Sequence, residues 1–173
     1  MNSNFAACLK FVLEDEGGYS NDPSDSGGAT DHGITQRELT AWCQLHGSPA
    51  IDVRQMTDAT IQTIYQQQYW QPNCDPLPKG TDYITFDMNV NMGPTQGTRL
   101  LQRALKVSAD GHFGVVTMAA AMAADPNVLI PAVSDEKIAF YKELEREQPK
   151  DVKFDRGWMN RVANVKARAM GMV

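Results

Sequence analysis

The chain has 173 residues, 42% of them hydrophobic, and a formal net charge of −5. This is enough for one ordinary domain or two small ones packed together. The acidic balance argues against a nucleic-acid-binding protein, which needs a basic face. No stretch approaches the roughly 20 apolar residues of a membrane-spanning helix. We therefore expect a globular protein that neither binds nucleic acid nor inserts into a membrane.

Apolar side chains recur at intervals of three and four near the N-terminus, at Phe5, Cys8, Leu9, Val12 and Leu13. This spacing predicts an amphipathic helix over residues 3–16, ended by Gly17-Gly18. Residues 18–34 are rich in Gly, Ser, Asp, Asn and Pro, which favour turns, so we predict a long loop or a short irregular hairpin there. Loops of this length inside compact domains tend to be functional.

Three more helices are predicted before the middle of the chain. The first runs from Thr35 to about His46 and the second from Thr57, a good N-cap, to Trp70. A largely apolar segment predicts the third over residues 82–92. Gly93-Pro94 follows as a helix stop and a new helix start, because proline is favoured at the first helical position.

The second half of the chain continues the helical pattern. Leu100, Leu101 and Leu105 give the helix after Gly93-Pro94 its core face, and residues 110–114 form a turn. Further helices are predicted over 115–124, from about 127 or 132 to 147, and over about 155–169. The fold class is therefore all-α, or mainly α. We divide the chain into regions 1–92 and 93–173, packed as one compact unit.

The cysteines and histidines give no sign of a metal site. Cys8, Cys43 and Cys74 are widely spaced and odd in number, which suits buried reduced thiols better than disulfides or zinc ligands. The three histidines form no cluster with them. We expect neither a metal nor a cofactor.

Glu16 is the first residue of chemical interest. It stands at the C-terminal end of the first predicted helix, where the partial negative charge of the helix dipole disfavours a carboxylate. Partial burial would act in the same direction, so both effects favour the protonated form that a general acid needs. Gly17 and Gly18 remove side-chain bulk beside it, so that a polymer can approach closely. Taken alone, a Glu at a helix end is usually a solvated surface residue.

A second carboxylate is expected on the loop that follows. Eight residues separate Asp25 from Glu16. A loop that folds back would place the two acids on opposite sides of a cleft. An inverting glycosidase uses such a pair about 6.5–9.5 Å apart, with a water between them. The Thr30 hydroxyl is suited to position that water. Asp22 and Asp31 compete with Asp25 for the role of base, and turn formation is the structural alternative for all of these residues.

Several motifs of the chain resemble glycoside hydrolase family 108, the lysozyme-like N-acetylmuramidases of phages and bacteria. In the first half they are Glu16-Gly17-Gly18-Tyr19, Asn21-Asp22-Pro23, Gly27-Gly28-Ala29-Thr30 and Gly33-Ile34-Thr35. The second half resembles the predicted peptidoglycan-binding region that accompanies this family. The residues that carry this match are Phe86-Asp87, Val90-Asn91-Met92-Gly93-Pro94, Leu100-Leu101-Gln102-Arg103-Ala104-Leu105 and Asp110-Gly111.

The resemblance implies a lysozyme-like helical fold with a long catalytic loop after the first helix. It also implies hydrolysis of the β-1,4 bond between N-acetylmuramic acid and N-acetylglucosamine, with Glu16 as the catalytic glutamate. Phage-type lysozymes show a similar order of Glu, Asp and Thr, usually with gaps of eight and then five residues. Here Asp25 and Thr30 follow with gaps of eight and four, and this departure affects those two roles but not that of Glu16.

Three residues are candidates for substrate binding. Tyr19 either stacks on a sugar ring or anchors the loop, and Asp22 lies in the same motif. Asp87 and Asn91 are one helical turn apart, and if buried they must be hydrogen-bonded. We interpret Asn91 as a cleft residue that contacts an N-acetyl group or braces the Glu16 loop, with the capping of a neighbouring helix as the structural alternative.

The expected partner is the glycan strand of peptidoglycan, and we expect a monomer. The N-terminal segment lacks the form of a secretory signal peptide, because its first basic residue, Lys10, lies inside the apolar stretch. A phage endolysin or a bacterial autolysin would then reach the wall by release or another export route. The rival functions are a lytic transglycosylase, and a non-catalytic module for wall binding or secretion.

Overall fold

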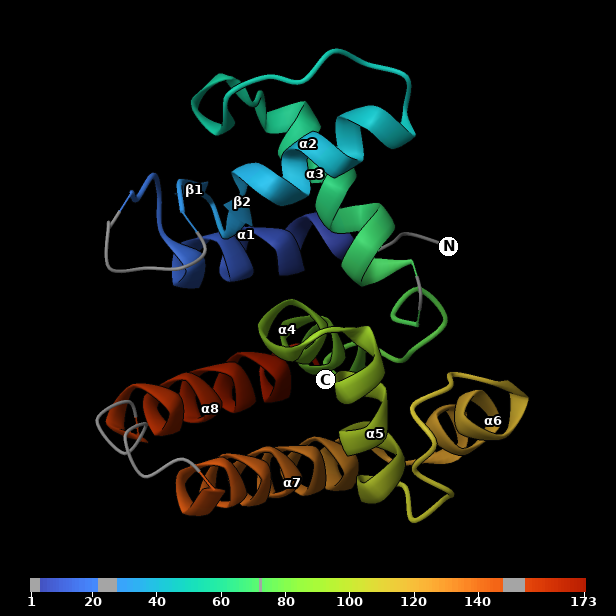
Figure 1. Cartoon of the computed structure of the whole chain (residues 1–173). Coiled ribbons are helices and arrows are strands. Elements are labelled where there is room, and N and C mark those ends of the chain that lie inside the picture. Colours follow the sequence, from blue (N-terminus) through green and yellow to red (C-terminus); the bar gives the residue numbers. More distant parts are fainter. Residues whose placement is uncertain (1–3, 22–27, 72, 148–154) are drawn as a thin grey trace. The chain divides into compact units, whose positions relative to one another are not determined.

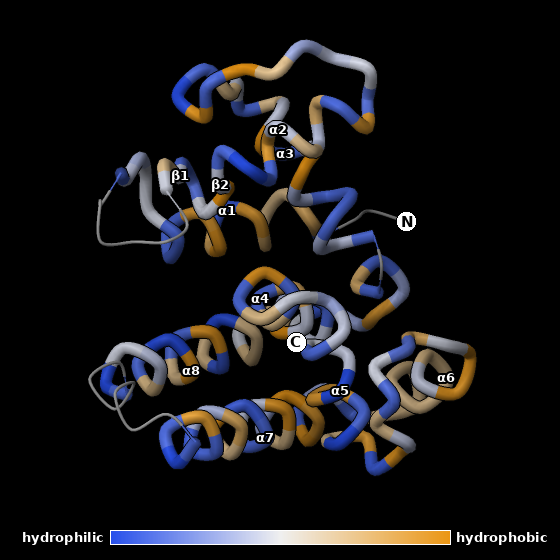
Figure 2. Tube along the Cα trace, in the orientation of Figure 1, coloured by the Kyte–Doolittle hydropathy of each residue, from blue (hydrophilic) through white to orange (hydrophobic). Residues whose placement is uncertain are grey.

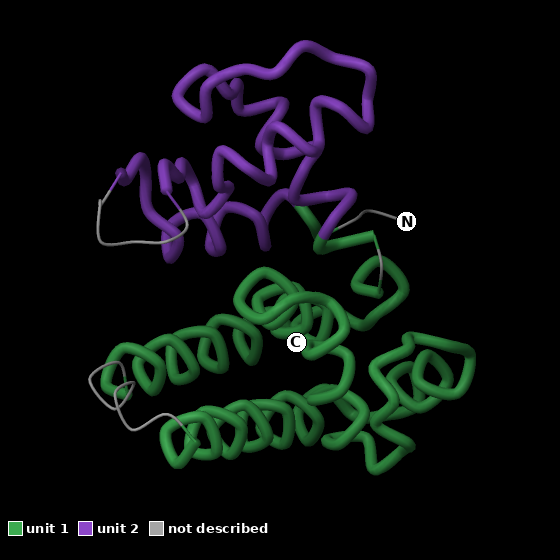
Figure 3. Tube along the Cα trace, in the orientation of Figure 1, with its two compact units in different colours: residues 1–5, 69–173 green, residues 6–68 purple. Residues whose placement is uncertain are grey.

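The computed structural model describes residues 4–21, 28–71, 73–147 and 155–173, and this part of the chain is almost entirely helical (Figure 1). It contains eight α-helices and two strands of two residues each. The predicted mainly-α, lysozyme-like fold class is therefore confirmed. By their contacts the residues divide into two compact units, residues 6–68 and residues 1–5 with 69–173 (Figure 3). The predicted division into regions 1–92 and 93–173 stays a prediction.

The first element is α1, Phe5–Glu16, which from Ala6 on belongs to the unit of residues 6–68 (unit 2 in Figure 3). The strands β1, Thr30–Asp31, and β2, Ile34–Thr35, follow and pair antiparallel. Then come α2, Gln36–Leu45, the short 3-10 helix η1, Val53–Gln55, and α3, Asp58–Tyr65. A π-helical turn η2, Gln66–Trp70, continues α3.

Both predicted helix starts in this unit are N-caps, as expected for Thr57. The Thr35 side chain accepts a hydrogen bond from the Glu38 amide, and the Glu38 carboxylate in turn accepts from the Thr35 amide, which completes a capping box. The Thr57 side chain accepts from the Thr60 amide at the start of α3. These caps satisfy backbone donors that a helix start leaves without partners, and they fix where α2 and α3 leave the loops.

The segment after α1 is an irregular hairpin in its described part. Ser20 and Thr30 exchange two backbone hydrogen bonds of 2.8 Å, and β1 pairs with β2 in the register Thr30–Thr35 and Asp31–Ile34. Residues 22–27 lie outside the described part. Of the two forms predicted for residues 18–34, the described ends correspond to the short irregular hairpin.

The unit of residues 1–5 and 69–173 (unit 1 in Figure 3) contains the other helices: α4 Thr81–Met92, α5 Pro94–Ala104, α6 Val115–Ala123, α7 Pro126–Glu147 and α8 Asp155–Met170. The predicted helices agree with these bounds to within a few residues, and Pro94 is the first residue of α5 as expected. Hydrophobic and hydrophilic residues alternate along α7 and α8 (Figure 2). By contrast, α4 is buried on all sides from Thr81 to Asn89, although more than half of this stretch is polar: Thr81, Asp82, Thr85, Asp87 and Asn89.

Among these buried residues of α4, the carboxylate of Asp87 has no exposed surface. Its Oδ2 lies 2.5 Å from Lys137 Nζ of α7, and its Oδ1 lies 2.9 Å from Arg161 Nη2 of α8. Lys137 is buried as well, while Arg161 keeps 17% of its side-chain surface exposed. These three residues, called here the Asp87 cluster, link α4, α7 and α8 by ion pairs. The expectation that a buried Asp87 must be hydrogen-bonded is thus met.

The turn predicted at residues 110–114 is tied to α5 by the buried side chain of Gln102. Its Nε2 donates to Asp110 Oδ1 at 2.8 Å and to Thr117 Oγ1 at 3.0 Å, and its Oε1 accepts from the Gly111 amide at 2.8 Å. One amide side chain therefore joins the end of α5, the turn and the start of α6.

Candidate active site

Glu16 is the last residue of α1 and is half-buried. The helix ends there because Gly17 adopts a left-handed conformation with φ of 75°, while its amide donates to the Leu13 carbonyl at 3.3 Å. A glycine in this conformation is the commonest way to close an α-helix. The predicted placement of Glu16 at the end of the first helix, with small residues beside it, is therefore what the structure has.

The hairpin between β1 and β2 turns through two residues, His32 and Gly33. Both have positive φ, 50° and 73°, which is the pattern of a type I′ turn. This mirror-image turn matches the twist of the strands on either side and strongly favours glycine in its second position. The turn therefore fixes the hairpin tip.

The Glu16 carboxylate lies against this turn. A Cβ atom at Gly33 would stand 3.0 Å from Glu16 Oε2 and 2.9 Å from Tyr65 Oη. The hydroxyl of Tyr65, a buried residue at the end of α3, donates a 2.7 Å hydrogen bond to the His32 carbonyl. The end of α1, the hairpin tip and α3 therefore meet at one point, and the missing side chain of Gly33 makes room for the acid.

A carboxylate and an imidazole stand side by side at the same hairpin tip. His32 Nδ1 lies 2.8 Å from Asp31 Oδ1, and the two side chains keep 38% and 14% of their surface exposed. Of the three aspartates considered as the second carboxylate, Asp31 is the one that the structure describes. Asp22 and Asp25 lie outside the described residues, so their roles stay predictions.

Thr30 lies on β1 and is half-buried. Its backbone pairs with Ser20, and its hydroxyl donates to the Gly28 carbonyl at 3.2 Å. This local hydrogen bond orients the hydroxyl, and a hydroxyl oxygen that donates once still has lone pairs with which to accept from a water. The role of Thr30 in water positioning stays a prediction.

Tyr19 follows Glu16 by three residues and is about half exposed, at 48%. The Arg54 guanidinium lies 5.6 Å from the centre of its ring, a cation–π distance. Arg54 also binds Asp52 through two hydrogen bonds of 2.9 and 2.8 Å, and these bonds lower the pKa of Asp52 to about 2. The Tyr19 ring is thus braced on one side by η1, and both predicted roles, sugar stacking and loop anchoring, are compatible with its exposure.

Asn91 belongs to the other compact unit, on the last turn of α4. Its Oδ1 accepts a hydrogen bond from the Tyr141 hydroxyl of α7, and the Tyr141 ring stacks on Trp158 with a centroid distance of 4.7 Å. This contact gives Asn91 a structural task inside its own unit. Its proposed contact with substrate stays a prediction.

Two residues that build this point, His32 and Tyr65, were not singled out from the sequence, and Gly33 entered only as part of a family motif. The dipeptide His32-Gly33 between two short β-prone segments was a usable signal for a two-residue turn. Tyr65 offered none, because it lies 33 positions from the carbonyl that it binds. Within the described residues, no three His, Cys, Asp or Glu side chains gather in a way that suits a metal ion.

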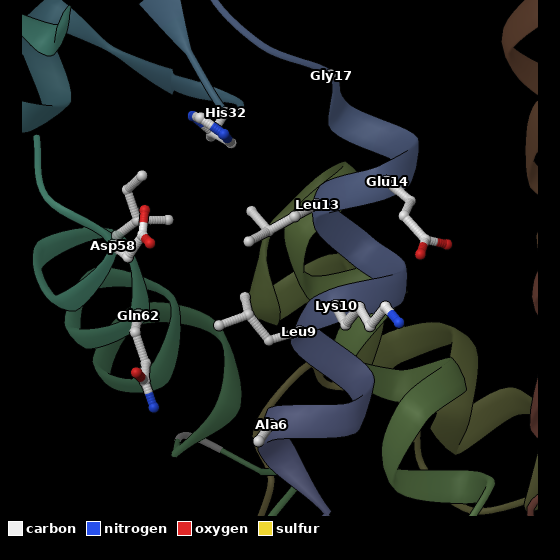
Figure 4. A pocket seen from close by; sticks show the side chains of 10 residues that line it. Ala6, Leu9, Lys10, Leu13, Glu14, Gly17, His32, Asp58 and Gln62 are labelled. Atoms are coloured by element: carbon white, nitrogen blue, oxygen red, sulfur yellow. The ribbon is translucent and has the colours of Figure 1, made fainter.

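A pocket of about 570 Å³ opens beside this site, between α1 and α3 (Figure 4). Leu9 and Leu13 point into it from α1, and His32, Asp58 and Gln62 lie opposite them. Gly17 lines the end of the pocket next to Glu16. We call this feature the α1–α3 pocket.

Gly33→Ala is expected to lower activity far more than stability. The added methyl group meets the Glu16 carboxylate and Tyr65, and a misplacement of about 1 Å in a catalytic group can cost about 100-fold in rate. The left-handed backbone adds strain of about 1–3 kcal/mol. Gly47→Ala is the matched control, because Gly47 has φ of 65° and no other atom lies within 4 Å of the place that its new methyl group would take.

The hydrolysis of cell walls that the sequence resemblance implies is measured for both variants, together with their unfolding in urea. Similar losses of stability are expected in the two, with a loss of activity in Gly33→Ala alone. Equal activity of the two variants would show that the space beside Glu16 does not matter for catalysis.

Comparison with known proteins assigns both halves of the chain. Residues 9–93 match the family model described as glycosyl hydrolase 108, and residues 96–163 match the model described as a predicted peptidoglycan domain. Among solved structures, the one described as "Structure of Brucella abortus SagA" is 33% identical to this chain, with a TM-score of 0.83. The match covers 98% of this chain and 95% of that one. No protein with a curated description matches the chain.

Proposed function

Since the chain belongs to the glycosyl hydrolase 108 family, we propose that it is an N-acetylmuramidase that cuts the β-1,4 bond between N-acetylmuramic acid and N-acetylglucosamine. The family makes the chain a glycoside hydrolase, and the peptidoglycan domain supports peptidoglycan as its substrate. The observation that carries the finer proposal is the place of Glu16, a half-buried acid at the end of α1, held against the hairpin tip.

In the proposed reaction Glu16 acts as the general acid. Its proton passes to the glycosidic oxygen as the bond to the anomeric carbon breaks, which makes the sugar a better leaving group. A Cβ atom at Gly17 would meet nothing within 4 Å, so the space at the end of α1 is open to a glycan oxygen. Tyr65 holds the His32 carbonyl and so fixes the turn against which this acid lies.

In the same step the attacking water needs a base. Asp25 is the proposed base, with Asp31 and Asp22 as the other candidates and Thr30 as the residue that positions the water. A separation of about 6.5–9.5 Å between the two carboxyl groups would give inversion, and about 5–5.5 Å would give retention. We propose inversion, with the base activating a water on the face of the sugar opposite Glu16.

We place this activity at the cell wall, where the protein would act as a phage endolysin or a bacterial autolysin. Among the residues that the structure describes, every helix is too short or too polar to cross a bilayer.

Mass analysis of digested sacculi tests the proposed bond. The expected products carry reducing N-acetylmuramic acid ends, formed with addition of one water. Products with 1,6-anhydro ends would identify a lytic transglycosylase instead. Protein that sediments with sacculi and releases no fragments would identify a non-catalytic wall-binding module.

A further inference from the structure

The α1–α3 pocket is distinct from the hairpin tip but continuous with it. Leu9 and Glu16 are seven residues apart, close to two full turns, so they lie on the same face of α1. Two neighbours of Glu16 also line the pocket. Gly17 is the next residue in the chain, and His32 belongs to the turn against which the Glu16 carboxylate lies. A polymer bound at Glu16 therefore has the pocket within reach of a side branch.

The lining of the pocket does not suit a sugar ring. Its inner wall is aliphatic, from Ala6, Leu9, Leu13 and Ile61, and no Trp, Tyr or Phe stands among the described residues that line it. Sugar faces pack best on aromatic rings, whereas methyl and methylene groups pack well on leucine and isoleucine. The wall therefore favours an alkyl chain over a saccharide.

The charge around the pocket favours a cation at the end of that chain. The charged residues that line the pocket include the acids Glu14 and Asp58 and the base Lys10. Asp58 lies with Gln62 on the exposed rim opposite the leucines, while Lys10 and Glu14 point to the other side of α1 (Figure 4). The unit that contains the pocket, residues 6–68, has three basic residues against nine acidic ones. An acidic surface of this kind raises the local concentration of cations and repels anions. An alkyl chain that ends in an ammonium group fits both the wall and the rim.

We propose that the α1–α3 pocket binds the peptide branch of peptidoglycan, through the alkylammonium side chain of its diamino acid. The aliphatic wall takes the methylene groups, and Asp58 pairs with the ammonium group at the rim. This proposal rests on the proposed function, because it takes the branch to hang from the glycan that Glu16 cuts. Cleavage would then prefer glycan that still carries its peptides.

Blocking the pocket with one side chain tests the proposal. Ala6 and Ala7 are both exposed on the first turn of α1, but only Ala6 lines the pocket. The probe is a synthetic peptide, L-Ala-γ-D-Glu-L-Lys-D-Ala, titrated against the full chain by calorimetry. Ala6→Trp is expected to weaken its binding by more than about tenfold, as filling a pocket removes most of its contact area, while Ala7→Trp leaves binding unchanged.

Two further titrations identify the group that is bound. The same peptide with an acetylated lysine side chain is expected to bind at least about threefold more weakly than the native peptide, because its ion pair with Asp58 is lost. Asp58→Asn is expected to weaken the native peptide about threefold, the usual size for an exposed ion pair, with the difference shrinking at high salt. Equal binding of the two peptides, or equal binding by Ala6→Trp and wild type, overturns the proposal.

Hydrolysis separates this proposal from the proposed function. The wild type is expected to cut peptide-bearing glycan faster than glycan stripped of its peptides, and Ala6→Trp is expected to cut both at the same rate. If the wild type cuts neither, the muramidase assignment fails, and the peptide titrations still decide the role of the pocket. Thermal unfolding of each variant, with a midpoint equal to that of wild type, shows that the tryptophan has not disturbed the fold.

Discussion

Glu16→Gln is expected to remove hydrolysis while leaving the fold and wall binding intact. Glutamine has the shape of the acid and can still make hydrogen bonds, but it has no proton to give to the glycosidic oxygen. General acid catalysis contributes about 10²–10⁴-fold to a rate, and a loss of this order is expected in the initial rate of release of reducing ends. Binding should persist, because the peptidoglycan domain at residues 96–163 is unchanged.

The matched control for this variant is Asp15→Asn. Asp15 is the exposed neighbour of Glu16 on α1, so its substitution makes the same change of net charge one residue away. Both variants are assayed for reducing ends from purified sacculi and for sedimentation with them. Wild-type hydrolysis by Glu16→Gln would refute the assignment of Glu16, and an equal loss in Asp15→Asn would point to the general charge of this helix end instead.

Asp87→Asn is expected to cause the largest loss of stability of any single substitution considered. It leaves Lys137 and Arg161 facing a neutral side chain, and Lys137 has only 1% of its side chain exposed. Removing one partner of a buried ion pair costs about 3–5 kcal/mol in the free energy of unfolding, because the remaining charge stays buried without compensation. Asp135→Asn, at an exposed position of α7, is the control and is expected to change it by less than about 0.5 kcal/mol.

A double variant tests the stated cause. Asp87→Leu combined with Lys137→Met removes the buried carboxylate and the buried ammonium group together, and Arg161 is already partly exposed to water. This variant is expected to be more stable than Asp87→Asn in urea unfolding, since replacing a buried pair by apolar groups is often nearly neutral. A double variant less stable than the single one would show that packing, not uncompensated charge, dominates.

The same cluster predicts how stability depends on pH. Burial alone would raise the pKa of Asp87, but the charges of Lys137 and Arg161 outweigh it and hold the pKa below the ordinary value of 3.8. As the pH falls, Asp87 therefore takes up a proton near pH 3.8 in the unfolded chain, but only at a lower pH in the folded protein. The contribution of Asp87 to stability is complete above pH 3.8 and is lost as the pH falls through the lowered folded pKa.

A second buried acid acts in the opposite direction. Burial raises the pKa of Asp82 at the start of α4, so its contribution to stability is greatest below pH 3.8 and declines as the pH rises through the raised value. The test therefore compares the slope of unfolding free energy against pH in wild type and in Asp87→Asn. A smaller slope in the variant between about pH 2 and 4 is expected, and identical slopes would contradict the role of Asp87.

The helices and their ends were predictable from local signals. Thr35 and Thr57 are capping residues, and Pro94 starts α5, as expected for each residue type. The end of α1 followed from two adjacent glycines, and this placed Glu16 correctly. Such signals act over three or four residues, so one sequence is enough to read them.

The contacts that build the site were not predictable in the same way. Periodicity shows which face of a helix is buried, but not which other helix covers it. Tyr65 reaches the hairpin tip 33 positions away, and Tyr141 reaches Asn91 from 50 positions away. The π-helical turn at Gln66–Trp70 also escaped prediction, because one extra residue in a turn barely disturbs the apolar pattern.

The bare α-carbon of Gly33 has a consequence for how this enzyme tolerates mutation. The acid owes its position to an atom that is missing, at a residue that need never touch the glycan. A single-base change in the Gly33 codon adds that atom back, so a point mutation at the hairpin tip is expected to inactivate the enzyme as a mutation of the acid does. Surveys of inactive alleles that inspect Glu16 alone would then overlook part of the mutational target.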